Sequence, residues 1–342
     1  MHAAAPAALA APASLAVDYV HGATPGALLG GDDVLAVFGF GDAAPRALDD
    51  PRYLHVPLQP FGDAPCEVWR GGGTVRHGRD GDIAWSSDGA LSFGAIEVDE
   101  RVHACADDPT GIVGAAAHAY ARMLGFVAAG RTPHLLRVWN YLDAITAGHG
   151  DGERYRQFCV GRARGLGTFD ACALPAATAI GRCDEARVLQ VYWLSAAAAG
   201  TPVENPRQVS AWRYPREYGP QPPSFARAML PPTDSRMPLL LSGTASVVGH
   251  ATMHAGALLA QLGETFANFD ALLGAARVRQ PALPAAFGAG TRLKVYVRDR
   301  ADMPAIAEAL HARFGGRVPL FLLHAAICRR DLAVEIDGVH GA

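Results

Sequence analysis

Glu335 is the residue of this sequence whose type and position best suit acid chemistry. It lies in the middle of the apolar segment Leu332–Ile336, which alternates as a strand does. A carboxyl group that is buried keeps its proton near neutral pH, because burial disfavours the charged form, and it can then act as a general acid. Strand alternation alone favours a plainer interpretation, a glutamate that faces solvent opposite Val334 and Ile336.

Cys328 precedes Glu335 by seven residues, on what we expect to be the partner strand of a hairpin. A lone buried cysteine most often contributes only packing. The residues alone therefore place a thiol near the carboxyl group and leave its role open.

Arginine side chains are the candidates for binding an anionic substrate, because the planar guanidinium group binds a carboxylate through two hydrogen bonds. The alternative for each is a surface ion pair, since most arginines are exposed. The candidates are Arg137, Arg154, Arg162, Arg207, Arg213 and Arg227. Further hydrogen bonds to a ligand could come from Tyr155, Tyr214, Tyr218, Ser242 and Thr244. Aromatic packing is the alternative for the tyrosines, and an ordinary strand-end turn for Ser242 and Thr244.

Other kinds of site find no support in the sequence. The run Gly71-Gly72-Gly73 is not followed by the Lys-Ser/Thr of a phosphate loop. His250 and His254 could share a helix face but have no third ligand nearby, so we expect no metal site. No GxSxG nucleophile motif occurs, and the six cysteines include no CxxC pair, which favours reduced thiols.

The elements that would position these side chains occur twice along the chain. In the second half, the periodicity predicts strands and helices in the order strand 239–245, helix 255–276, strand 293–297, helix 302–314, strand 320–328 and strand 332–339. In the first half, the same order occurs at 90–96, 111–130, 135–142, 152–164, 175–181 and 187–194. This order predicts an α+β fold of two tandem ββαβαββ units, at about 74–199 and 205–340, each closed by its last two strands as a pair.

The repeat also suggests a domain division. Residues 1–16 are rich in Ala and Pro and are expected to form a disordered leader. We expect an N-terminal domain at 17–199, in which 17–73 is an extra piece without a clear assignment, and a C-terminal catalytic unit at 200–342. The Pro-rich stretches 201–206 and 220–232 mark the linker and the start of the second unit. Tyr192 of the first unit aligns with Glu335, so only one copy has the carboxyl group.

Composition excludes several classes of protein. The chain has 342 residues, of which 50% are hydrophobic and 18% charged, enough for a large core. The net charge of −3 gives no indication of a nucleic-acid or membrane-surface partner. The start of the chain lacks the basic residues of a secretory signal, and no apolar run approaches the roughly 20 residues of a membrane span. We therefore expect a cytoplasmic protein.

Each predicted unit resembles the YjgF/RidA-like fold, a chorismate-mutase-like barrel half, and the second copy matches better. Its matching features are Ser242-Gly243 at a strand end, Gln261 and Asn268 in the helix, and Val334-Glu335-Ile336 as an acidic closing strand.

The region from about 74 to 340 is similar to the chorismatase family, once described as pteridine-dependent deoxygenase-like. Eight segments carry the resemblance in order: Leu136–Tyr141, Arg154–Phe158 with Gly161-Arg162, Pro175–Gly181, Glu204–Val209, Tyr218-Gly219-Pro220, Phe225–Ala228, Ser242–Ser246 and Cys328–Leu332. The chain departs from the family in the Ala-rich leader and at 280–290.

The resemblance implies an enzyme that splits chorismate into pyruvate and a ring acid. It places the catalytic acid at Glu335, which would protonate the enolpyruvyl methylene carbon, and it associates a cysteine at position 328 with the branch that forms 3-hydroxybenzoate. Some members also release 4-hydroxybenzoate. Arg162 and Arg227 become the preferred carboxylate ligands, because both lie in matching segments. The chemistry requires no cofactor and no metal, and two fused units favour a monomer.

Three alternatives remain at this point. A chorismate hydrolase would give 3,4-dihydroxycyclohexa-1,5-diene carboxylate and pyruvate. A RidA-like imine deaminase would need the Arg of a Pro-Ala-Arg motif, whereas the matching strands here read Pro175-Ala176-Ala177 and Leu323-His324-Ala325. A YjgF-like module could also bind a small molecule without catalysis, although the presence of Glu335 argues against it.

Overall fold

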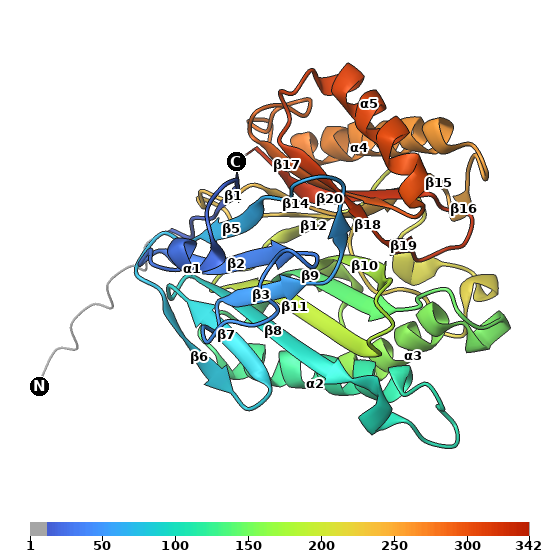
Figure 1. Ribbon diagram of the computed structural model, residues 1–342, viewed down its shortest axis with the longest axis horizontal. Coiled ribbons are helices and arrows are strands. Elements are labelled where there is room, and N and C mark those ends of the chain that lie inside the picture. The colour runs from blue at the N-terminus through green and yellow to red at the C-terminus, as the bar shows by residue number, and fades with distance from the viewer. Residues whose placement is uncertain (1–11, 342) are drawn as a thin grey trace, which may run out of the picture.

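Two seven-stranded mixed sheets pack against each other in the computed structural model, which describes residues 12–341, and helices cover their outer faces (Figure 1). Apolar segments of this chain are long enough to bury two faces of a sheet, one against the helices and one against the other sheet. Among residues 12–341, one core lies between the sheets, one lies under each pair of helices, and a smaller fourth cluster belongs to the N-terminal residues 29–68.

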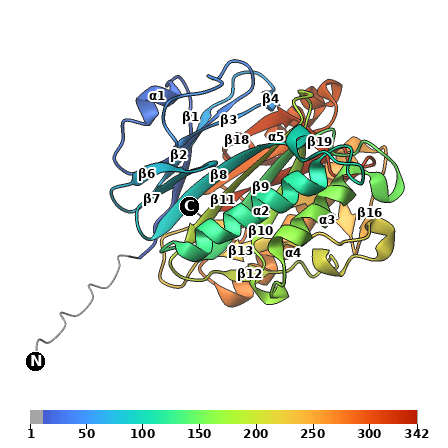
Figure 2. The same ribbon diagram turned by 90° about the horizontal axis from the view of Figure 1, so that it is seen from below.

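The first sheet belongs to the first predicted unit. Its elements are β6 (Arg76–Asp80), β7 (Ile83–Ser87), β8 (Leu91–Asp99), α2 (Ile112–Ala129), β9 (His134–Asp143), α3 (Arg154–Leu166), β10 (Ala176–Arg182) and β11 (Val188–Ala196). The strand order is β19-β10-β9-β11-β8-β7-β6. Helices α2 and α3 lie side by side across this sheet (Figure 2). They bury Ile112, Met123 and Phe158 against it, at the spacing that the sequence shows.

The second sheet repeats this arrangement with additions at its edge. Its elements are β12 (Thr201–Val203), β13 (Ala228–Leu230), β14 (Leu239–Ala245), α4 (Leu258–Arg279), β17 (Thr291–Val297), α5 (Met303–Phe314), β18 (Leu320–His324) and β20 (Val334–His340). The strand order is β12-β13-β14-β20-β17-β18-β4. A small ribbon of β15 (Val247–Val248) and β16 (Ala251–Thr252) stands apart. Helices α4 and α5 cover the outer face (Figure 1).

The repeated order of strands and helices confirms the prediction of two tandem α+β units. The predicted pairing within each unit was wrong in one respect. The last two strands do not pair with each other, because β9 lies between β10 and β11, and β17 lies between β18 and β20. A strand that follows a crossover helix lies parallel to and beside the strand before that helix, so the final strand must pair on the other side.

The edge strand of each sheet is paired with a strand from elsewhere in the chain. Strand β19 (Ala326–Ile327) leaves the second unit and pairs antiparallel with β10 of the first. Strand β4 (Gln59–Pro60) comes from the N-terminal piece and pairs with β18. These exchanges cover edges that would otherwise expose unpaired backbone groups, and they hold the two units together.

Residues 17–73, which the sequence did not assign, form a third sheet. It contains β1 (Ala16–Val20), β2 (Val34–Phe40), β3 (Tyr53–Val56) and β5 (Cys66–Arg70) in the order β1-β5-β2-β3, with the short helix α1 (Pro25–Leu28). The predicted leader extends too far, because Leu15 is buried and its amide donates to the carbonyl of Arg236. Residues 1–11 of that leader lie outside the described residues.

The linker between the units is also more regular than its prolines suggest. Its two Pro-rich stretches contribute β12 and β13 to the edge of the second sheet. Between them lie the short 3-10 helices Ala211–Arg213 and Arg216–Tyr218. Helix α2 is long and apolar enough to qualify for a membrane span by composition alone. Its buried residues contact the first sheet and α3, which accounts for its apolar character.

Candidate active site

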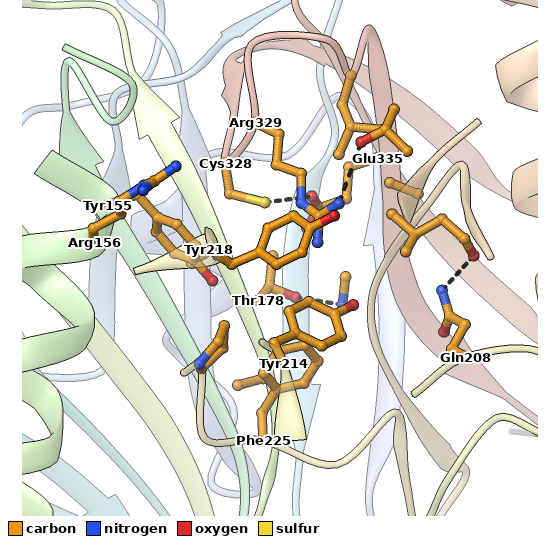
Figure 3. Close-up of a pocket in the computed structure, with 18 of the residues that line it drawn as sticks. Tyr155, Arg156, Thr178, Gln208, Tyr214, Tyr218, Phe225, Cys328, Arg329 and Glu335 are labelled. Atoms are coloured by element: carbon orange, nitrogen blue, oxygen red, sulfur yellow. Dashed lines mark hydrogen bonds between the residues drawn. The ribbon is translucent and has the colours of Figure 1, made fainter. Parts of the chain in front are cut away.

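A cavity of about 320 Å³ lies where the two units and the linker meet (Figure 3). Its walls come from α3 and β10 of the first unit, the linker segment 208–227, β14 of the second unit and the segment that runs from Cys328 to Glu335. A volume of this size, at the junction of two units, is typical of a pocket for a small molecule.

Glu335 reaches this cavity from β20. The residue is 5% exposed, and Oε2 has a single weak contact, with Sγ of Cys328 at 4.0 Å. Burial, together with the charge of Asp337, raises the pKa of Glu335 to about 8, against the opposing charges of Arg137, Arg227 and Arg329. At neutral pH most of the carboxyl group is therefore protonated, as a general acid must be.

Gly243 of β14 lies directly against this carboxyl group. A Cβ atom at this position would overlap Oε1 of Glu335. The amide of Gly243 donates to Oγ1 of Thr178, 3.0 Å away on β10. The absence of a side chain at position 243 thus lets two strands from different units close around Glu335.

Cys328 follows β19 and is next to Glu335. Burial, followed by the nearby carboxyl group, raises the pKa of this thiol. Cys328 is therefore a neutral thiol at physiological pH, suited to contact with a ligand rather than to nucleophilic attack.

Three arginines of the cavity wall have no carboxylate partner among residues 12–341: Arg162, Arg227 and Arg329. Arg162 of α3 is 1% exposed, and its neighbours are neutral: it donates to Sγ of Cys159 at 3.7 Å and lies beside the hydroxyl of Tyr120. Its Nε has no partner. A buried guanidinium group without a counterion is costly, so this position favours an anionic ligand.

Arg227 and Arg329 are held by neutral groups. Arg227 donates through Nη2 to the carbonyl of Val209 at 2.9 Å and to the hydroxyl of Tyr214 at 2.8 Å, and its Nε also lacks a partner. Arg329 donates through Nη1 to the carbonyl of His250 at 2.8 Å, and its guanidinium lies 4.3 Å from the centre of the Tyr218 ring. Both keep their positive charge for a ligand.

The three tyrosines named by the sequence also line the cavity. Tyr155 comes from α3, and its ring is stacked with that of Phe158. Tyr214 and Tyr218 each end one of the linker 3-10 helices, and their ring centres are 5.4 Å apart. The close-up shows Tyr155, Tyr214 and Tyr218 around the same space as Glu335 (Figure 3).

Other residues named from the sequence lie outside the cavity wall. Arg213 packs beside Trp212, with its guanidinium 5.7 Å from that ring. The hydroxyl of Ser242 accepts from the amide of Ala177 and donates to the carbonyl of Ala226, and the hydroxyl of Thr244 donates to the carbonyl of Ser242. These serine and threonine hydroxyls therefore stabilise strand contacts.

The remaining candidate arginines have carboxylate partners. The three pairs are Arg137 with Asp337 at 3.2 Å, Arg154 with Glu100 at 2.6 Å and Arg207 with Glu264 at 2.5 Å. The pairs of Arg137 and Arg154 are buried, so these two arginines stabilise the fold and are not available to bind a ligand.

Sequence reasoning missed several residues of the wall, among them Thr178, Gly243, Phe225 and Arg329. All four lie in segments that had been matched to a family, yet no local pattern distinguishes them from their neighbours. Of these four residues, Arg329 was the easiest to predict, because it directly follows Cys328. Within residues 12–341, no three His, Cys, Asp or Glu side chains are grouped as a metal site requires.

The cavity thus combines a protonated carboxyl group with three guanidinium groups that lack counterions. Such a set binds a small molecule with more than one negative charge and delivers one proton to it. Aromatic side chains complete the wall, as expected for a ligand with a flat ring.

Comparisons with known proteins agree with this arrangement. Residues 67–195 match the family model "Chorismatase FkbO/Hyg5-like, N-terminal". A chorismatase from Streptomyces hygroscopicus is 35% identical over 284 residues, which cover 81% of this chain and 79% of the relative. A 3-hydroxybenzoate synthase from the same organism is 32% identical over 326 residues, 90% of this chain and 92% of the relative. A crystal structure of a chorismatase superposes with a TM-score of 0.79 at 32% identity, covering 97% of this chain and 99% of that one.

Proposed function

This chain belongs to the chorismatase family, and from that premise we propose that it cleaves chorismate to pyruvate and 3-hydroxybenzoate, with Glu335 as the catalytic acid. The observation that carries the proposal is the position of Glu335, a buried carboxyl group of pKa about 8 facing a cavity with three arginines that lack counterions.

Chorismate offers an enol ether and two carboxylates to these groups. Glu335 donates its proton to the enolpyruvyl methylene carbon, and the positive charge then develops on the adjacent carbon as an oxocarbenium ion. The ether bond to the ring then breaks, its electron pair passes to the carbonyl oxygen of pyruvate, and the positively charged ring loses one proton as it becomes aromatic. Protonation of carbon is slow without a positioned acid, so the raised pKa of Glu335 supports the assignment.

The two substrate carboxylates need cationic partners in the cavity. Arg162, Arg227 and Arg329 supply three, from α3, the linker and the segment before β20. Their origin in both units implies that a bound substrate bridges the units. Binding of a dianion would also neutralise the cations that lower the pKa of Glu335, which favours the protonated acid further.

The ring product depends on whether water enters. Chorismate has the atoms of pyruvate plus hydroxybenzoate, whereas the dihydroxy-cyclohexadiene acid requires one added water. Cys328 brings a neutral thiol next to Glu335 and reduces the space beside the acid. This supports the route without added water, and hence 3-hydroxybenzoate as the main product.

The experiment is incubation of the purified protein with chorismate, with pyruvate and ring acids separated by chromatography. We expect pyruvate and 3-hydroxybenzoate in equal amounts. Pyruvate with the dihydroxy-cyclohexadiene acid would contradict the product and keep the family activity, and unchanged chorismate would contradict the function. Cys328→Ala should raise the share of the hydrated product, whereas the exposed Cys172→Ala should leave the ratio unchanged.

A further inference from the structure

Asp337 lies two residues beyond Glu335 on β20, and alternate strand residues point to the same face. The two carboxyl groups have opposite surroundings. Glu335 faces the cavity and has no strong hydrogen bond, whereas Asp337 is fully buried between the sheets and does not line the cavity. Only Glu335 has a role in the reaction proposed above.

One oxygen of Asp337 accepts hydrogen bonds from four side chains, which lie on three strands. Oδ2 accepts from the Arg137 guanidinium at 3.2 Å, the Trp139 indole at 3.0 Å, the Thr178 hydroxyl at 2.8 Å and the Tyr296 hydroxyl at 3.1 Å. A carboxylate oxygen is suited to accept so many bonds, one of them from a cation. The other oxygen, Oδ1, is buried without a partner.

Thr178 connects the Asp337 carboxylate to the catalytic acid Glu335. Its hydroxyl donates to Asp337 and also accepts from the amide of Gly243, whose Cα lies against Glu335. A change at Asp337 therefore reaches Glu335 in two ways, through its charge and through the strand that encloses the acid.

The buried charges between the sheets balance without Glu335. Arg137 pairs with Asp337, and Lys294 pairs with Glu67 at 2.9 Å. An ionised Glu335 would add a further negative charge beside Asp337. The charged or titratable groups that face Glu335 from the elements around it are Asp337, Arg137, Arg227, Cys328, Arg329, Tyr155 and Arg298.

We propose that Asp337 is a positioning residue whose fixed negative charge keeps Glu335 protonated, and whose contact with Thr178 holds Gly243 against the acid. The proposal rests on the function proposed above. Arg137, Trp139 and Tyr296 secure the carboxylate, so the charge stays in place while Glu335 gives up and regains its proton.

The test is the pH dependence of kcat/KM for the wild-type protein and Asp337→Asn. Asparagine keeps an oxygen for the neutral donors and removes the charge. Two charges roughly 7 Å apart, at an effective dielectric constant of about 20, shift a pKa by about one to two units. We expect the decrease of kcat/KM on the alkaline side to begin about one to two pH units lower in Asp337→Asn, with KM at low pH changed less than about threefold. The exposed Asp270→Asn should leave the profile unchanged.

Asp337→Asn leaves Arg137 without its charged partner and could prevent folding. A second variant keeps the test decisive in that case. Tyr296→Phe removes one donor from Asp337, keeps its charge and changes no residue of the cavity wall. The charge is then less neutralised, and the alkaline decrease should move to higher pH by a few tenths of a unit. No movement in either variant, or movement in the opposite direction, would overturn the proposal.

A direct titration separates this proposal from the proposed function. The carbonyl stretch of the protonated Glu335 is identified by the infrared difference between wild type and Glu335→Gln, and its midpoint is followed with pH. A lower midpoint in Asp337→Asn supports the proposal even if chorismate is not consumed, and an unchanged midpoint refutes it even in an active enzyme.

Discussion

Gly243 and Glu335 lie so close that the carboxyl group occupies the space of a side chain at position 243. The two residues belong to β14 and β20, which pair antiparallel with an irregularity between Leu241 and Thr244. The irregularity includes Gly243, and the carboxyl group of Glu335 lies against this glycine, between the two units.

Gly243→Ala should therefore displace Glu335 without unfolding the protein. The new Cβ overlaps Oε1, and the carboxyl group must turn away from the substrate, so we expect kcat to fall at least tenfold. The matched control is Gly263→Ala in α4, where nothing lies within 4 Å of the added atom. That variant should keep full activity and gain up to about 1 kcal/mol of stability. Equal activity in both variants would contradict the contact.

The value of kcat/KM should decrease once on the alkaline side, because Glu335 loses its proton there. The acid must carry its proton in order to donate it, and burial and Asp337 raise its pKa to about 8. We predict that kcat/KM is highest below pH 8 and falls tenfold per pH unit well above it. Initial rates of pyruvate release between pH 6 and pH 10 check this. A decrease centred near the ordinary glutamate pKa would refute the assignment.

Stability should depend on pH through the same group. Between about pH 4.5 and pH 8, the folded protein holds a proton on Glu335 that the unfolded chain has released, so the free energy of unfolding decreases as pH rises. Glu335→Gln has no such proton. We predict that this variant gains stability relative to wild type with rising pH, by a few kcal/mol at most across that range. Denaturant unfolding at pH 5 and pH 8 measures it, with the exposed Glu308→Gln as the control; a constant difference would be evidence against burial of the acid.

Arg329 should contribute mainly to substrate binding. Its guanidinium group has no carboxylate partner among the described residues and lies at the cavity wall beside Tyr218. Loss of one charge-assisted hydrogen bond costs about 1.5–3 kcal/mol, so Arg329→Gln should raise KM by roughly 10- to 100-fold. Arg131→Gln, at an exposed position, should not change KM. If both variants behave alike, the anionic end of the substrate binds elsewhere.

The sequence predicted the repeated elements well because their hydrophobic periodicity is local. Helices α2 to α5 and strands β8 to β11 were expected within a few residues of where they lie. The partners of the closing strands were mispredicted because pairing depends on residues far apart, such as Glu335 beside Tyr296. The strand predicted at 320–328 is two strands, β18 and β19, and β4 lies in the N-terminal piece that the sequence left unassigned.

The site was predictable only in part for the same reason. Alternation alone placed Glu335 at the surface. Its role as an acid was indicated by the likeness to a family and by the aligned Tyr192, which leaves a carboxyl group in only one copy. Nothing local distinguishes Arg154, which pairs with Glu100, from Arg162 in the same helix, which has no carboxylate partner among residues 12–341. Which arginine has a counterion is decided by the packing of distant segments.

The most direct measurement is the rate of pyruvate release from chorismate by wild type and Glu335→Gln, prepared alike and shown to be equally folded. Glutamine keeps the size of the side chain and cannot donate an acidic proton. The account predicts release of pyruvate by wild type and a loss of at least about 100-fold in the variant, the usual contribution of a general acid. Turnover by Glu335→Gln within a few-fold of wild type would contradict the role of Glu335.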